Sequence, residues 1–202
     1  MNKLSKIFKE DSHYRALFLS LLFSAIGFGL YKGVIDNYMA EVVKIEEFDR
    51  GLTEFFRELP GLLLVLILAI FYKSSAERMY KIGMIIMVIG MTMQALISPT
   101  KLLVIAAIFF YSTGEHIQLG MKNTLSLEYS KDGKGGEALG YQNSIYQIGN
   151  LFGYGVIIVA FALVQSTALF SPTFMAAAIC MLLAMLVSLR MTGQSKTDKN
   201  KS

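Results

Sequence analysis

The chain has 202 residues, of which 54% are apolar and 17% are charged, and its mean hydropathy is +0.50. Such a composition excludes an ordinary water-soluble domain of this size. A membrane-spanning helix needs about 20 apolar residues, so the chain has room for about six such helices and for no separate catalytic domain. The net charge of +4 does not indicate a nucleic-acid partner, because the basic residues lie between apolar stretches and form no basic domain.

The first apolar stretch, residues 16–31, follows a basic start of three lysines and one arginine. Cleavable signal peptides begin in the same way. Here the apolar stretch continues past Gly33 without a convincing small-residue cleavage motif. We therefore predict a retained signal anchor, with a helix from about Tyr14 to Met39 after an amino-terminal segment of residues 1–13.

The second and third predicted helices cover about Leu52–Tyr72 and Tyr80–Ile97. Charged side chains occupy the opening turns of the second helix, and Pro60 and Gly61 follow them directly. Proline is tolerated in the first turns of a helix, and glycine commonly packs against a neighbouring helix, so we expect no break there. The third helix is uncharged through its interior and ends at the turn formed by residues 98–100.

The fourth predicted helix runs from about Lys101 to Tyr129 and carries charges inside an otherwise apolar sequence. From Ala138 to Leu189 there are 52 consecutive residues with no charge, interrupted by the turn-like residues 165–167. This stretch predicts the fifth and sixth helices. Residues 14–192 would thus form one transmembrane domain, and the polar tail of residues 193–202 is expected to be disordered.

The distribution of basic residues predicts the orientation of the chain. With the amino terminus in the cytoplasm, thirteen of the 19 Lys and Arg residues fall in cytoplasmic segments. Only Lys44, Arg50 and Lys101 fall in the opposite loops. This bias follows the positive-inside rule and places both termini in the cytoplasm of a multi-pass protein of the cell (inner) membrane.

Two segments carry a family resemblance. In Ala76-Glu77-Arg78-Met79-Tyr80-Lys81, the acidic Glu77 and the basic Arg78 and Lys81 are similar to the cytoplasmic signature of the major facilitator superfamily, although Lys73 and Tyr80 replace its glycines. The segment 136–141, which leads into the glycines of the fifth helix, is similar to the start of helix 5 in that superfamily. The glycines expected to form a closely packed face are Gly149, Gly153 and Gly155.

The resemblance covers residues 14–192 and implies an all-α fold of six transmembrane helices, arranged as two inverted three-helix repeats. It further implies alternating-access transport of a small solute, with the chain as the amino-terminal half of such a transporter. Transport would then require a missing carboxy-terminal half or a homodimer. The resemblance also implies that the loop with Glu77, Arg78 and Lys81 latches the inner face.

Polar stripes lie on the four helices that surround the central cavity in this superfamily, namely the first, second, fourth and fifth. Charges inside a membrane are costly and face a partner or a wet cavity. We expect Glu115 and Lys122 to line the path of solute or of a proton or other coupling ion, with Asn143 and Gln147 as a hydrogen-bonding wall. Further path candidates are Lys32, Gln118 and Asn150.

A structural interpretation competes with each of these assignments. Lys32 and Asp36 share a helix face near its outer end, where an internal salt bridge or snorkelling would explain them. Asp36, Arg57 and Glu58 fit a structural group, with an extracellular gate closed by Asp36 and Arg57. His116 is more typical of a satisfied interior histidine than of a proton relay.

Other functions fit the sequence less well. The only histidines are His13 and His116, and the single cysteine is Cys180, which excludes a zinc protease motif, a thiolate metal site and a disulfide framework. We expect no cofactor and no enzyme activity. A small channel or a non-transporting accessory membrane subunit remains the main alternative to a transporter.

Overall fold

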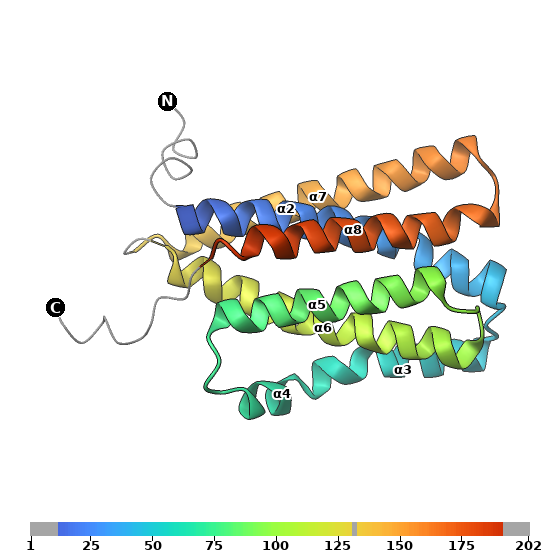
Figure 1. Ribbon diagram of the computed structural model, residues 1–202, viewed down its shortest axis with the longest axis horizontal. Helices are drawn as coiled ribbons and strands as arrows, with labels where there is room; N and C mark the ends of the chain where they lie inside the picture. The colour runs from blue at the N-terminus through green and yellow to red at the C-terminus, as the bar shows by residue number, and fades with distance from the viewer. Residues whose placement is uncertain (1–11, 131–132, 192–202) are drawn as a thin grey trace.

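The computed structural model describes residues 12–130 and 133–191, and these residues are helical with no β-strand among them (Figure 1). The long helices are α2 (Ser12–Tyr38), α3 (Glu47–Leu62), α5 (Ala76–Leu96), α6 (Lys101–Glu128), α7 (Gly135–Leu163) and α8 (Phe170–Ser188). Three shorter elements join them, namely the π-helical turn η1 (Met39–Val43), the short helix α4 (Leu64–Ile70) and the 3-10 turn η2 (Thr167–Leu169).

Five segments of the described chain are long and apolar enough to cross a membrane. They comprise α2 with η1, α5, α6, α7, and η2 with α8. The chain is therefore a multi-pass membrane protein. The predicted bounds of the first, third and fourth helices differ from the observed ones by a few residues. Most of the predicted amino-terminal segment 1–13, and all of the predicted tail 193–202, lie outside the described residues.

The second predicted helix is not continuous. The stretch Leu52–Tyr72 contains the end of α3 and then α4, which are separated at Leu63. Proline at position 60 lacks an N–H and leaves the Phe56 carbonyl without its helical partner, which bends the helix. Our expectation of an unbroken helix there was wrong, because Pro60 lies near the end of α3 and not in its first turn.

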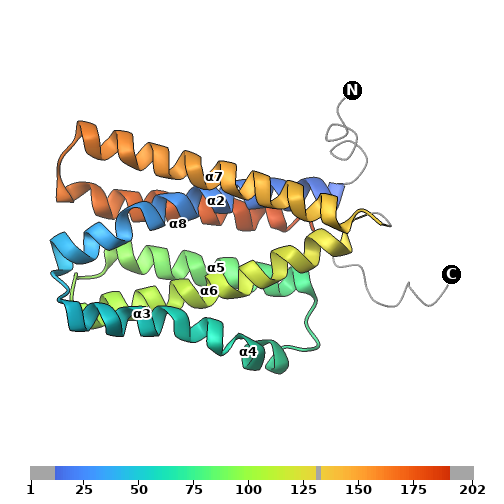
Figure 2. The ribbon, with the colours of Figure 1, turned by 180° about the vertical axis from the view of Figure 1, so that it is seen from behind.

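The helices form two groups of three that lie side by side along the bundle. Helix α2 packs against both α7 and α8, while α6 packs against both α5 and α3. Contacts between α5 and α8 join the groups. Both ribbon views show α2, α7 and α8 on one side and the α3–α6 segment on the other (Figures 1 and 2).

Small residues allow the closest helix contacts. A Cβ atom added to Gly153 of α7 would lie 2.6 Å from the carbonyl oxygen of Ile26 on α2, and one added to Gly149 would lie 2.7 Å from Ala25 Cβ. The predicted glycine face is confirmed at these two positions. It does not include Gly155, which has no atom within 4 Å of an added Cβ.

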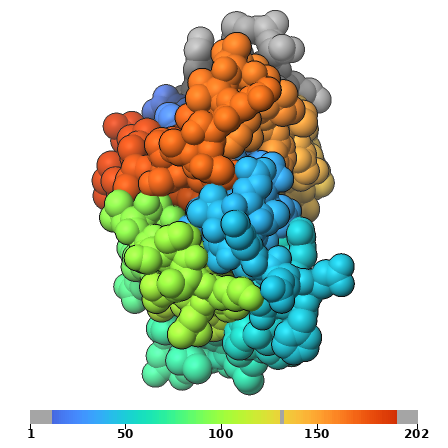
Figure 3. Space-filling view, turned by 90° about the vertical axis from the view of Figure 1, so that its right-hand side faces the viewer, coloured from blue at the N-terminus to red at the C-terminus, as the bar shows by residue number. Residues whose placement is uncertain are grey.

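The ends of the bundle are formed by distinct sets of loops. The beginning of α2 lies at the same end as the end of α8 (Figure 1). Figure 3 shows the opposite end, where η1, the start of α3 and the α5–α6 and α7–α8 connections gather. The chain turns sharply after η1 at Lys44, whose φ of 56° is left-handed. Together α3 and α4 return the chain to the end at which α5 begins (Figure 2).

Candidate functional site

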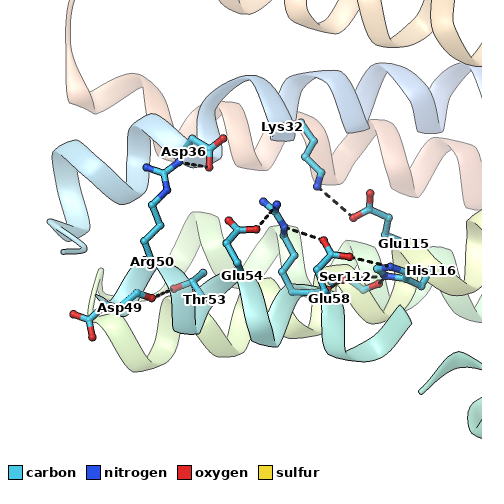
Figure 4. Close-up of polar contacts among 11 residues, drawn as sticks. Lys32, Asp36, Asp49, Arg50, Thr53, Glu54, Glu58, Ser112, Glu115 and His116 are labelled. Atoms are coloured by element: carbon cyan, nitrogen blue, oxygen red, sulfur yellow. Dashed lines mark hydrogen bonds and ion pairs between the residues drawn. The ribbon is translucent and has the colours of Figure 1, made fainter. Parts of the chain in front are cut away.

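An ion pair joins the two central helices of the groups. Lys32 Nζ on α2 lies 3.6 Å from Glu115 Oε2 on α6, and Figure 4 shows the lysine reaching from its helix toward the carboxylate. Glu115 is only 8% exposed. The lysine ammonium also lies 5.4 Å from the centroid of the Phe28 ring and 5.6 Å from that of Tyr111. Lys32 thus neutralises a buried carboxylate and does not pair with Asp36 on its own helix.

Charged side chains of α3 form a second cluster beside this pair. Arg57 pairs with Glu54 and, at 3.6 Å, with Glu58. Glu58 Oε2 lies 3.9 Å from His116 Nε2 on α6. The Ser112 hydroxyl donates a hydrogen bond to the Arg57 carbonyl oxygen. These contacts connect α3 to α6 (Figure 4).

His116 occupies the contact between α3 and α6. Its Nδ1–H donates to the Ser112 carbonyl oxygen at 3.0 Å. A Cβ added to Gly61 would lie 2.5 Å from His116 Nε2, so the glycine leaves the space that the imidazole fills. This packing role agrees with the structural interpretation of His116.

At the end of the bundle where η1 meets α3, the ion pairs differ from the predicted gate. Asp36 pairs with Arg50 at 3.4 Å, and Asp49 pairs with Lys101. Arg57 pairs within α3 instead, so the structure does not bring Asp36 and Arg57 together as a gate. Sequence reasoning missed Arg50 because it lies in a loop in the predicted topology, whereas it belongs to the first turn of α3.

Lys122 lies further along α6 and is 7% exposed. Its Nζ is 3.8 Å from the centroid of the Tyr146 ring on α7. No acidic side chain of the described residues lies within ion-pair distance of it. Lys122 borders an open pocket of about 600 Å³ between α6 and α7, which is also lined by Leu119, Asn123, Leu139, Gly140, Gln142 and Asn143.

The other predicted path residues are placed differently from one another. Gln118 is buried and its Nε2 donates to Ser24 Oγ at 3.0 Å, so it joins α6 to α2. Asn143 and Gln147 are both exposed on α7. Asn150 is 7% exposed, and its Oδ1 has no hydrogen-bond partner in the part of the chain that the structure describes.

Two stacked tyrosines beside the Lys32 pair were not predicted from the sequence. The rings of Tyr31 on α2 and Tyr111 on α6 have centroids 3.9 Å apart. The Tyr31 hydroxyl group is buried and has no hydrogen-bond partner among the described residues. In an apolar helix, the sequence does not show whether a tyrosine ring faces a cavity or packs against other side chains. One indication was present in the sequence: Tyr31 is adjacent to Lys32, and Tyr111 lies four residues before Glu115.

The candidate latch at the other end makes specific contacts. Glu77 is buried and accepts a hydrogen bond from the Tyr129 hydroxyl at 3.1 Å. Lys81 Nζ donates to the Met191 carbonyl oxygen at 2.8 Å. The side chain of Arg78 is exposed, and its backbone N–H is capped by Ser75. Glu77 and Lys81 therefore connect the start of α5 to the ends of α6 and α8.

The described residues contain no group of three His, Cys, Asp or Glu side chains that could hold a metal ion. No family model matches the chain, and no curated protein matches it in sequence.

Proposed function

We propose that the chain is one half of a proton-coupled secondary transporter of the major facilitator type, which moves a small solute by alternating access. In this proposal the path is lined by the faces of α2, α3, α6 and α7. A second six-helix unit, either a separate chain or a second copy, supplies the opposite wall. The protein would lie in the cell (inner) membrane with both termini in the cytoplasm.

The Lys32–Glu115 pair is the observation that carries the proposal. Burying a carboxylate and an ammonium in the interior of a bundle is costly even when they pair. Charged side chains kept inside membrane spans commonly mark a solute or ion path. The pair joins α2 and α6, the first and fourth helices of the proposed six. A proton arriving at Glu115 would release Lys32, so the pair couples protonation to the contact between these two helices.

Paired contacts support an internal two-fold relationship between the proposed halves of the bundle. Ser24 contacts Gln118, and Tyr31 stacks on Tyr111. Tyr111 follows Ser24 by the same number of residues as Gln118 follows Tyr31. Ser24 of α2 is therefore equivalent in position to Tyr111 of α6, and Tyr31 of α2 to Gln118 of α6. Each contact joins one member of each equivalent pair, as expected of inverted repeats.

The glycine contacts follow the same exchange. Gly27 of α2 lies against Ala177 and Met181 of α8, and Gly114 of α6 lies against Gly83 and Met87 of α5. The shift from Gly27 to Gly114 equals that from Ser24 to Tyr111. A second constant difference in residue number relates Gly83 to Ala177 and Met87 to Met181. The proposal of two three-helix units, with α3 and α4 together as the second span, rests on this correspondence.

Solute-driven proton movement into proteoliposomes tests the proposed transport. The protein is extracted in mild detergent with any copy or partner that it retains, and is reconstituted with a trapped pH-sensitive dye. Sugars, organic anions and short peptides are then added in turn. We expect one class to acidify the interior, and Glu115→Gln to abolish this proton movement. The variant Gln165→Ala changes an exposed side chain in the loop after α7, outside the proposed path, so it serves as the control and should leave the proton movement unchanged.

A non-transporting accessory subunit or a small channel would give different results. Solute-independent ion current would indicate a channel, and absence of both solute and proton movement from the complete assembly would contradict the transporter proposal. The break between α3 and α4 favours neither alternative, because bent helices are common where membrane proteins line a cavity.

A further inference from the structure

The pocket between α6 and α7 has the chemistry of an anion site. We propose that it binds the carboxylate or phosphate group of a small organic anion through Lys122. This inference rests on the proposed function, because it names the class of solute that the path would carry. It assigns the anion to a place about two helical turns along α6 from the Lys32–Glu115 pair, or roughly 10 Å.

The charges of the described interior leave Lys122 unbalanced. Lys32 and Glu115 neutralise each other, and the α3 cluster contains its own acids and base. Lys122 has neither an acidic side chain nor a hydrogen-bond acceptor among the described residues, although it is 93% buried, the complement of its 7% exposure. Burying an ammonium without an anion is costly, and a bound anion would remove that cost.

The face of the Tyr146 ring supports the cation but does not neutralise it. The ammonium lies 3.8 Å from the ring centroid, within the range of a cation–π contact. This contact covers one side of the ammonium group. Its remaining N–H donors stay available to an acceptor in the adjoining pocket.

Neutral hydrogen-bond donors lie on the same pocket wall. Gln142 accepts a hydrogen bond from Ser126 at its Oε1, so its amide NH₂ is left as a donor without a partner in the described part of the chain. Asn123 and Asn143 add two exposed amide groups. One cation with several amide donors and no carboxylate is the donor set expected for an anion.

The rest of the lining sets the size and character of the ligand. Leu119 and Leu139 provide apolar surface beside the polar wall. A volume of about 600 Å³ falls within the range of small-molecule pockets. The pocket therefore fits an organic anion with a compact apolar body better than a bare inorganic ion.

Ligand-induced stabilisation tests this assignment. The purified protein in phosphatidylcholine nanodiscs is heated with a thiol-reactive dye that reports exposure of Cys180. Benzoate is the probe, and benzamide is its uncharged counterpart of the same shape. We expect benzoate to raise the unfolding temperature and benzamide to leave it unchanged. Inorganic phosphate, which lacks the apolar body, should act only at higher concentration.

Variants locate the site. Lys122→Met should weaken benzoate binding about tenfold or more, as expected for loss of a charge-assisted hydrogen bond, and Lys122→Arg should retain it. Lys134→Met removes an exposed lysine outside the pocket and should have no effect. If Lys122→Met does not fold, Asn143→Asp places a repelling carboxylate on the exposed wall and should weaken binding. Absence of stabilisation in the wild-type protein, or equal stabilisation of Lys122→Met, would overturn the proposal.

Two further experiments distinguish a lipid headgroup from a soluble anion, and binding from transport. If phosphatidylglycerol in the nanodisc stabilises the protein through Lys122 and benzoate does not compete, the site holds a lipid headgroup and the proposed solute is wrong. Uptake of radiolabelled benzoate into proteoliposomes then distinguishes the two proposals. Binding without uptake contradicts transport and leaves the anion site intact, whereas uptake that is unchanged in Lys122→Met contradicts the site alone.

Discussion

At the scale of single residues, charged and small side chains determine how closely the helices approach and which faces stay polar. Glu115 is stabilised by one lysine from another helix, and Gly153 lacks the Cβ atom that would clash with the α2 backbone. Both effects can be measured by single substitutions, because each has a neighbouring residue that serves as its control.

Gly153→Ala should destabilise the protein by about 1–3 kcal/mol, the usual cost of overpacking. The new Cβ would lie 2.6 Å from the Ile26 carbonyl oxygen and 2.9 Å from Gly29 Cα, and both neighbours are backbone atoms that cannot move alone. Gly155→Ala is the matched control on the same helix and should be neutral or slightly stabilising. Equilibrium unfolding in mixed detergent measures both, and equal effects would contradict the tight α2–α7 contact.

Neutralising one member of the Lys32–Glu115 pair should cost on the order of 3 kcal/mol, because the other charge is left buried. The double variant Lys32→Gln/Glu115→Gln should lose less than the two single variants together. The exposed Asp36–Arg50 pair is the comparison, and its removal should cost less than about 1 kcal/mol. A double-mutant cycle on unfolding free energy tests this. Additive losses would show that the charges do not interact.

At the scale of elements, α4 differs from every other apolar helix. It has seven residues, and none of them is buried. In contrast, α5 buries residues along its whole length. The exposed side chains of Val65 and Ile70, each 75% exposed, leave α4 a surface for lipid or for the proposed second unit. After the break at Leu63, α4 lies apart from the other helices of the bundle (Figure 1).

Amides of α4 should exchange hydrogen faster than those of α5, because few packed contacts oppose local opening. Pro60→Ala restores an N–H donor and should slow exchange in residues 60–70. Pro172→Ala, in the first turn of α8, is the control and should change little, since an N–H there has no helical partner. Hydrogen–deuterium exchange in nanodiscs gives both results. Equal protection of α4 and α5 would mean that another surface covers α4.

At the scale of the whole molecule, the loops at the two ends of the bundle should face opposite sides of the membrane. Single cysteines are placed at Lys44 and Ser98 at one end, and at Ser74 and Lys134 at the other, in a Cys180→Ser background. In intact cells an impermeant maleimide should label the first two alone. Labelling of Lys44 and Ser74 from the same side would show that α3 and α4 do not form a span.

Apolar runs and turn residues were enough to predict most of the helices, because burial of about 20 apolar residues in lipid is a local property of sequence. The charges within the fourth helix predicted that Glu115 and Lys122 line a path for solute or protons; the structure buries both residues, and the path itself stays a prediction. The break at Leu63 could not be read in this way. Pro60 is compatible with a first turn or a bend, and the start of α3 at Glu47 decides between them.

The sequence by itself determined that this is an all-helical, multi-pass membrane protein with charged residues inside its spans. Only the tertiary structure decided which charges meet, because ion pairs such as Lys32–Glu115 and Asp36–Arg50 depend on how separate helices rotate and pack against one another. The lack of an acidic partner for Lys122 among the described residues was decided at that level too. An unpaired charge is defined by the absence of neighbours in space, which the order of residues along the chain does not specify.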